Sequence, residues 1–369
     1  MSATSRIKLW LEDGTEISGM SFGYEKSIAG EVVFNTAMTG YPESLTDPSY
    51  KGQILVLTYP LVGNYGVPFQ EEENNLLKFF ESSALHISGL VISDYSHDYS
   101  HWNAERSLGD WLKENKIPGI YGVDTRFLTK ILREKGSMLG KIICNDKDVA
   151  IYDPNLDKLV DQVSTKKKEV YGIGKYKILL VDCGVKFNII RYLLKRDTTV
   201  IRVPWNYDFL KEDYDGLFIS NGPGDPKRCD ATIRNLGRAF EETRPIFGIC
   251  LGNQLMGLAS GADTYKLKYG HRSHNQPVLR HGSNHAYITS QNHGFAINNN
   301  TLTSNWEPLY INLNDNTNEG MIHTLKPFFS TQFHPEASGG PTDTAFLFDR
   351  FIEMIKEYKG EEITERIAI

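Results

Sequence analysis

The second half of the chain alternates short apolar runs with stretches that have apolar residues at helical spacing. Continuous apolar runs cover residues 177–181, 216–219 and 246–249. Strands that are apolar at every position are buried on both faces, and their alternation with helices predicts a parallel sheet covered on both sides. We therefore expect an α/β domain with a mostly parallel, doubly covered sheet over residues 177–360.

The first half of the chain has the pattern of strands and hairpins. Residues 6–144 contain several apolar or alternating runs separated by turn residues, including an Asp-Gly turn in WLEDGTEIS. Two segments, 107–116 and 123–136, have apolar residues at helical spacing instead. The pattern predicts a β-rich N-terminal α/β domain over residues 1–152.

Two further segments lie outside these domains. Residues 153–176 are polar, Lys-rich and interrupted by glycines, which is typical of a linker. Residues 361–369 are expected to form a tail. The sequence leaves open whether this tail ends the protein or leads into a longer polypeptide.

Composition and charge narrow the class of protein. The chain has 369 residues, with 40 basic and 46 acidic side chains and a net charge of −6, which argues against a nucleic-acid binder. No apolar run approaches the ~18 residues of a membrane span, and the N-terminus lacks the apolar core of a signal peptide. Four scattered cysteines do not form a disulfide framework. We expect a cytoplasmic enzyme.

The apolar run 246–249 leads into Cys250, which lies between Gly248 and Gly252. Glycines at a strand-to-helix junction allow the strained turn that presents a nucleophile above a sheet. A thiol in the first turn of a helix is also stabilised as a thiolate by the helix dipole. Taken alone, the pattern leaves a buried structural cysteine equally open, since free cysteines are usually buried.

His334 and Glu336 follow the apolar run in FFSTQF, residues 328–333. If that run is a strand that reaches them, side chains two apart project to the same face, and Glu336 could hold the His334 ring. A cysteine nucleophile needs such a base and a group that orients it. The alternative is a surface ion pair. Pro335 weighs against the alternative because it ends the strand at the edge where α/β sheets bind ligands.

The apolar run 216–219 leads into a turn that contains Gly222, Pro223 and Gly224. A glycine turn at a strand end leaves backbone N–H groups exposed, as an oxyanion hole requires, although an ordinary turn is the alternative. Three such features, each after an apolar run of one sheet, together predict a cysteine acyl-transfer site.

Five histidines lie close together in the sequence, at positions 271, 274, 281, 285 and 293. Neither paired cysteines nor a helical HExxH motif accompanies them, and the intervening Pro and Gly residues break any common helix face. We expect no metal site in this chain.

These motifs allow a family comparison. The C-terminal half resembles the class I, or triad, glutamine amidotransferases, which carry a cysteine elbow, a PGDP turn at a strand end and a late HPE motif. The N-terminal half resembles the small-subunit domain of glutamine-dependent carbamoyl-phosphate synthetase, through GEVVFNTAMTGYPESLTDPSYKGQILVLTYPLVGNYG and YGVDTRFLTKILREKG. Together the two resemblances cover roughly residues 6–358.

The resemblance implies a role for individual residues. Cys250 would be the nucleophile, His334 the base and Glu336 its orienter, with an oxyanion hole made by backbone N–H groups of Gly222 and Leu251. The glutamine pocket would be lined by Ser49, Gly222, Gly224, Leu251, Gln254, Asn292, Gly294 and Phe295. Many members have His where this chain has Asn253, a departure that touches no triad member. Some relatives replace the nucleophile by Ser and lose glutamine use, whereas this chain keeps Cys250.

The activity implied by the resemblance is that of a glutaminase. L-glutamine would be hydrolysed through a thioester on Cys250 to glutamate and ammonia. A synthetase subunit or domain, separate or in the same polypeptide, would combine this ammonia with bicarbonate and two ATP into carbamoyl phosphate for arginine and pyrimidine synthesis. No cofactor is expected in this chain, which lacks a G-x-x-x-x-G-K-[ST] motif, while ATP and a divalent metal are expected on the partner.

Two readings from other classes stay open. A free-standing Cys-dependent γ-glutamyl hydrolase or peptidase would release its product efficiently without a synthetase. A catalytically silent binding subunit would be unaffected by Cys250→Ala. Neither accounts for the N-terminal domain.

Overall fold

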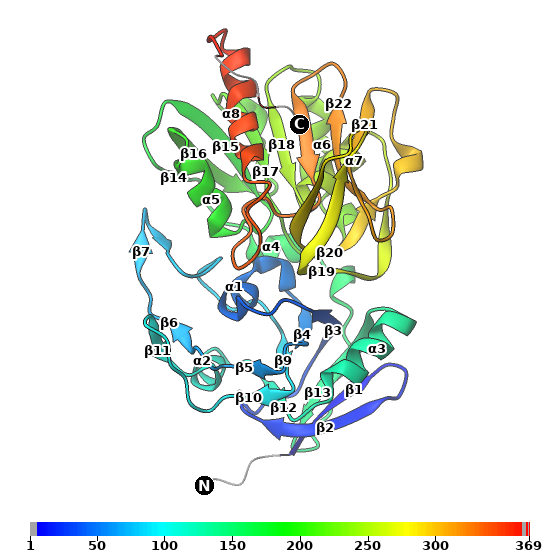
Figure 1. The fold of residues 1–369 in the computed structure, drawn as a ribbon. Helices are drawn as coiled ribbons and strands as arrows, with labels where there is room; N and C mark the ends of the chain where they lie inside the picture. Colours follow the sequence, from blue (N-terminus) through cyan, green and yellow to red (C-terminus); the bar gives the residue numbers. More distant parts are fainter. Residues whose placement is uncertain (1–5, 364–366, 368) are drawn as a thin grey trace. The chain divides into compact units, whose positions relative to one another are not determined.

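The computed structural model describes residues 6–363, 367 and 369, and the chain divides into two compact units, Met1–Asp157 and Lys158–Ile369 (Figure 1). Each unit has its own sheet and its own hydrophobic core. In the described part of the chain, no helix combines the length and apolar character needed to cross a membrane.

The first unit is built around a closed seven-stranded barrel in the order β1-β13-β3-β4-β9-β12-β2. The barrel strands are β1 Arg6–Leu11, β2 Glu16–Ser21, β3 Ile28–Asn35, β4 Gln53–Leu57, β9 Gly89–Val91, β12 Gly119–Tyr121 and β13 Met138–Cys144. Short pairs lie outside it: β5 Leu61–Val62 with β10 Asp94–Tyr95, β6 Val67–Pro68 with β11 Ala104–Arg106, and β7 Glu72–Glu73 with β8 Leu76–Leu77. Its α-helices are α1 Tyr41–Thr46, α2 Leu108–Glu114 and α3 Thr125–Lys135.

Local signals in the sequence explain several boundaries of this unit. Gly14 adopts a positive φ of 87° in the turn between β1 and β2, where the Asp13 carboxylate accepts a hydrogen bond from the Thr15 N–H. Helix α3 begins after Asp124, whose carboxylate accepts from the Phe127 N–H, and it ends before Gly136. The helices expected over 107–116 and 123–136 are confirmed.

The second unit contains a ten-stranded sheet in the order β14-β16-β15-β17-β18-β23-β22-β21-β19-β20. The parallel strands are β15 Tyr176–Asp182, β16 Thr198–Pro204, β17 Gly216–Ile219, β18 Ile246–Ile249 and β23 Phe328–Thr331. The antiparallel strands are β14 Glu169–Tyr171, β19 Thr264–Arg280, β20 Ala286–Ile297, β21 Trp306–Asn312 and β22 Asn318–His323. The expected parallel sheet is therefore confirmed, and an antiparallel half extends it beyond β23.

Helices cover both faces of the parallel strands, as the apolar pattern predicts. Leu217 and Ile219 of β17 face the core that also contains residues of α6 and α7. Phe218, between them, packs on Phe348 and Phe351 of α8 instead. The helices of this unit are α4 Leu159–Val163, α5 Phe187–Leu194, α6 Asp230–Ala239, α7 Leu251–Ala259 and α8 Phe346–Tyr358. The 3-10 helices of the chain are η1 Pro48–Tyr50, η2 Pro154–Leu156, η3 Phe209–Lys211, η4 Pro226–Arg228 and η5 Asn299–Thr301.

The segments expected to be linker and tail differ from those expectations. Residues 153–176 include α4 and β14, and β14 pairs with β16 in the large sheet, so the boundary between the units falls after Asp157. In the segment 361–369, Glu361 accepts hydrogen bonds from Lys175 and Tyr176, while residues 364–366 and 368 lie outside the described part.

Candidate active site

Cys250 lies on a strained elbow between β18 and α7. Its backbone has φ 56° and ψ −103°, a conformation that L residues rarely adopt, and its N–H donates to the Thr331 carbonyl over 2.7 Å. The neighbouring glycines are required by close packing. A Cβ on Gly252 would come within 2.2 Å of the Ile219 carbonyl oxygen, and one on Gly248 within 2.6 Å of the Met256 sulfur. The glycine pattern therefore lets α7 start directly against the ends of two strands.

The thiol of Cys250 is distinguished by its surroundings and not by its burial. All four cysteines of the chain are free and buried. The Cys250 Sγ lies 3.7 Å from the carbonyl oxygen of Asn292, and its side chain interacts with His334, whose pKa it helps to raise. The His334 Nε2 is buried and forms no hydrogen bond within the described residues, so one ring nitrogen remains for the thiol. Catalytic hydrogen bonds are often long in the absence of substrate.

His334 and Glu336 form the buried pair expected from the sequence, although not through a strand. The His334 Nδ1 donates to Glu336 Oε1 over 2.7 Å, and both side chains are almost completely buried. Strand β23 ends at Thr331, so the expected strand up to His334 is wrong. A tight turn brings the two together instead, with the Ala337 N–H bonded to the His334 carbonyl and a positive φ at Ala337. Because the pair is buried, the surface ion pair is excluded.

Lys186 is the functional residue that the sequence reasoning missed. Its Nζ donates to Glu336 Oε1 over 2.9 Å and to the Ala337 carbonyl over 2.8 Å, and its side chain is buried. The available signal was a lone Lys in the otherwise apolar stretch at the start of α5, because a buried Lys requires a partner. Asn188, two residues on, donates to the Glu336 carbonyl and fixes the same turn.

Charges around the pair set its protonation. Burial raises the pKa of Glu336, but Lys186 and His334 outweigh it and hold that pKa at about 2. Burial lowers the pKa of His334, while the Glu336 carboxylate raises it, with a further contribution from Cys250, to about 10. The imidazolium is therefore favoured at neutral pH, which is the state that pairs with a thiolate and later donates a proton.

The structure brings several expected pocket residues of the second unit to the elbow. The Gln254 side chain donates to the Phe295 carbonyl over 2.8 Å, which ties α7 to β20 beside Asn292. Leu251 is the first residue of α7, where backbone N–H groups have no partner within the helix. Gly222 lies against it, since a Cβ on Gly222 would be 2.9 Å from a Leu251 methyl and 2.0 Å from the Cys183 carbonyl oxygen.

For three other predicted pocket residues, Gly224, Gly294 and Ser49, the structure gives local contacts. Gly224 has a φ of 85° in the turn after β17, and a Cβ on Gly294 in β20 would lie 3.2 Å from the Arg272 guanidinium. Ser49 belongs to the first unit, where its N–H donates to the Asp47 carboxylate in η1. The roles of these residues in substrate binding stay predictions.

Asn253 anchors the elbow helix. Its side-chain oxygen accepts from Ser330 Oγ over 2.7 Å, and its amide donates to Gln332 Oε1 over 3.2 Å. The Asn253 side chain is fully buried. The departure from the family's usual His therefore affects how α7 is held against β23 and leaves the triad geometry intact.

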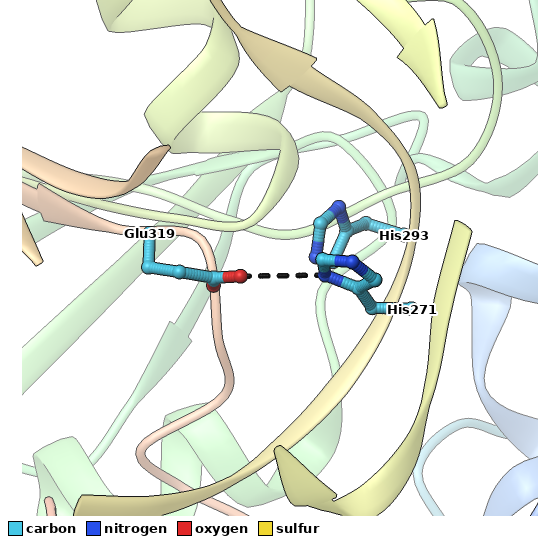
Figure 2. Close-up of side chains that lie close together, drawn as sticks. All are labelled: His271, His293 and Glu319. Carbon is cyan, nitrogen blue, oxygen red and sulfur yellow. Dashed lines mark ion pairs between the residues drawn. The ribbon is translucent and has the colours of Figure 1, made fainter. Parts of the chain in front are cut away.

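A second buried cluster contains His271, His293 and Glu319, with ligand-type atoms within 4.8 Å of one another (Figure 2). The two nitrogens of His271 lie 2.8 Å from Asp315 Oδ2 and 3.0 Å from Gln291 Oε1. Because both oxygens are acceptors, both nitrogens carry protons and neither offers a lone pair to a metal. Burial lowers the pKa of His271, but Asp315 and Glu319 raise it to about 9. The cluster fits a hydrogen-bond network, and the expectation of no metal stays a prediction.

A thiol on an elbow beside a buried His-Glu pair fits a cysteine acyl-transfer site, and comparison with known families identifies the class as glutamine amidotransferase. Residues 179–354 match the family model "Glutamine amidotransferase class-I". Residues 9–142 match "Carbamoyl-phosphate synthase small chain, CPSase domain". The arginine-specific small chain of carbamoyl phosphate synthase from Saccharomyces cerevisiae is 50% identical over 372 residues, which cover 97% of this chain and 90% of that protein. The chain belongs to the carbamoyl-phosphate synthase small-chain family.

Other relatives are much longer than this chain. The rat mitochondrial carbamoyl-phosphate synthase [ammonia] is 53% identical over 359 residues, which cover 96% of this chain and 24% of that protein. The multifunctional protein URA2 of Saccharomyces cerevisiae is 50% identical over 399 residues, which cover 98% of this chain and 18% of that protein. The chain thus spans about a quarter or less of the length of these relatives, and the family occurs both as a small chain and within longer proteins.

Proposed function

We propose that the chain is the glutaminase component of a carbamoyl-phosphate synthase, which hydrolyses L-glutamine and passes the ammonia to a synthetase partner. The observation that carries this proposal is the Cys250 elbow beside the buried His334–Glu336 pair. Membership of the small-chain family supports the choice of glutamine as substrate over a peptide.

In the first half of the reaction, the Cys250 thiolate attacks the side-chain carbonyl carbon of glutamine. The negative charge that develops on the carbonyl oxygen is stabilised by the backbone N–H groups of Gly222 and Leu251, each worth about 100- to 1000-fold in rate. The His334 imidazolium donates its proton to the departing nitrogen. The C–N bond breaks, ammonia leaves, and a γ-glutamyl thioester remains on Cys250.

In the second half, the neutral His334 ring removes a proton from water, and the resulting hydroxide attacks the thioester. The C–S bond breaks, which releases glutamate and restores the thiolate–imidazolium pair. Glu336 stabilises the imidazolium in both halves, because its carboxylate is held ionised by Lys186.

The partner in this proposal is a synthetase large subunit or domain, in trans or in the same polypeptide. It binds the two ATP and the divalent metal, and this chain contributes no cofactor. The carbamoyl phosphate serves arginine or pyrimidine synthesis. A cytoplasmic location remains part of the proposal, and because the rat relative is named as a mitochondrial protein, cell fractionation is the direct check.

Amide-¹⁵N glutamine tests the function. With a synthetase partner, ATP and bicarbonate, the label should appear in carbamoyl phosphate, and glutamate release should increase over that of the chain alone. Efficient glutamate or peptide release by the chain alone, without any partner-dependent rise, would identify a free-standing hydrolase. Unchanged turnover in Cys250→Ala would identify a binding subunit.

A further inference from the structure

The strand that carries Asn292 is paired with β19 over only a short stretch next to the nucleophile. Residues 271–273 of β19 pair with 291–293 of β20, and the register shifts on both sides of this stretch. Register is not propagated through such irregularities, so the local pairing needs its own fixation. This matters for the site because the Asn292 carbonyl lies 3.7 Å from Cys250 Sγ.

A buried charge network supplies that fixation. The His271 ring lies between two carboxylates. Its Nε2 lies 2.8 Å from Asp315, and its Nδ1 lies 3.3 Å from Glu319, the ion pair dashed in Figure 2. Both ring nitrogens face acceptors, so the ring carries two protons and one positive charge. Glu319 is fully buried and is held in turn by the Asn312 amide over 2.9 Å.

The network reaches the pocket through Gln291 and His293. His271 Nδ1 donates to Gln291 Oε1 over 3.0 Å, and the His293 ring packs edge-on against the His271 ring with the ring centroids 4.9 Å apart. His293 Nδ1 donates over 2.8 Å to the Phe295 carbonyl, which also accepts from Gln254 of the elbow helix. Burial and the adjacent His271 charge lower the pKa of His293, which keeps that ring neutral. The residues on either side of Asn292 are thus held by one network.

We propose that His271 is a positioning residue for glutamine: clamped between Asp315 and Glu319, it fixes Gln291 and His293 and thereby holds the 291–295 segment of β20 against Cys250. His271 itself does not touch the reacting atoms. This inference rests on the proposed glutaminase function. It assigns a role in substrate binding to three residues, His271, Asp315 and Glu319, that the triad chemistry does not use.

The test compares glutamine KM and kcat of the full chain with those of His271→Gln. Loss of a charge-assisted contact should raise KM about tenfold or more with kcat little changed, because pocket contacts act equally on bound substrate and transition state. The rate of Cys250 alkylation by iodoacetamide should stay at the wild-type value. The matched control is His323→Gln, since the His323 ring accepts hydrogen bonds from the backbone N–H groups of Leu325 and Lys326 and packs against Trp306 and Phe328.

Asp315→Asn provides a second variant if His271→Gln does not fold. The Asp315 side chain is 42% exposed, so this substitution removes charge without creating a cavity, and KM should rise in the same direction with an unchanged melting temperature. A wild-type KM in either folded variant overturns the inference. A higher KM that is accompanied by a lower kcat and a lower alkylation rate overturns it as well. If the wild-type chain hydrolyses no glutamine, the proposed function fails before the inference is reached.

Discussion

At the residue scale, Lys186 controls the ionisation of a carboxylate that has no exposure to water. The folded pKa of Glu336 is about 2, below the ordinary value, so its contribution to stability is present above about pH 4.3 and is lost as the pH falls toward 2. Lys186→Met should move this loss to higher pH and reduce the free energy of unfolding at neutral pH by about 3 kcal/mol. Urea unfolding across pH measures both effects.

Lys177→Met is the matched control for that prediction. Lys177 pairs with Asp213 at the surface, where both side chains are exposed, so its removal should leave the unfolding curve unchanged. Equal behaviour of the two lysine variants would show that Lys186 does not hold Glu336 ionised.

His334 gives the opposite dependence on pH. Its folded pKa is raised to about 10, so its stabilising contribution is complete below the ordinary value of about 6.5 and is lost as the pH rises through 10. In His334→Gln, this decline between pH 6.5 and 10 should disappear from the unfolding free energy. Because the acid-base group is lost, kcat should fall about 100- to 10,000-fold while glutamine binding persists. Turnover close to wild type would exclude His334 as the base.

At the scale of elements, the junction between β18 and α7 depends on the absence of a side chain at position 252. A Cβ there would lie 2.2 Å from the Ile219 carbonyl oxygen, which belongs to the strand backbone and cannot move aside. Gly252→Ala should therefore displace α7, lower the melting temperature and abolish glutaminase activity together. Gly237→Ala, in the last turn of α6, is the control, since the nearest atom to its Cβ would be 4.0 Å away. That variant should gain about 0.5–1 kcal/mol of stability.

The parallel part of this fold was predictable because its strands are continuously apolar. The expected runs at 216–219 and 246–249 coincide with β17 and β18, and the glycines after them marked both turns of the site. Cys250 could be proposed as the nucleophile because it directly follows β18, and His334 and Glu336 could be proposed as its partners because they follow β23. The turn that joins His334 to Glu336 was not foreseen, since it depends on a positive φ at Ala337 that no local signal announces.

The antiparallel half of the large sheet could not be predicted from the hydrophobic pattern. The surroundings of Cys250, which this half provides, could therefore not be predicted either. Strand β19 spans 17 residues but is rich in His, Arg, Asn and Gln, so its sequence lacks apolar alternation. Its buried His271 side chain is held by hydrogen bonds to Gln291 of β20 and to Asp315, which precedes β22, and these partners lie 20 and 44 residues away in the sequence. Lys186 was missed for the same reason, because its partner is 150 residues away.

At the scale of the whole molecule, Cys250, His334 and Glu336, the proposed triad, all belong to the unit Lys158–Ile369, whereas Ser49, a predicted pocket residue, belongs to the other unit. In the proposed function, the synthesis of carbamoyl phosphate is a separate reaction on the synthetase partner, which receives its nitrogen from this chain as ammonia. Ammonia is mostly protonated near neutral pH, and the ammonium ion is not a nucleophile. Nitrogen supplied as glutamine should therefore be used far more efficiently than nitrogen supplied as ammonium in the medium.

This separation predicts the behaviour of Cys250→Ala in complex with a synthetase. Carbamoyl phosphate formation from glutamine should be abolished, because no thioester can form, whereas formation from a high concentration of ammonium chloride should persist and increase with pH. Cys229→Ala, which removes a buried thiol outside the triad, should keep both activities. Equal loss of both activities in Cys250→Ala would indicate a failure of assembly. Continued use of glutamine would refute the nucleophile, since a glutaminase without its thiolate has no other group on the elbow to form the bond.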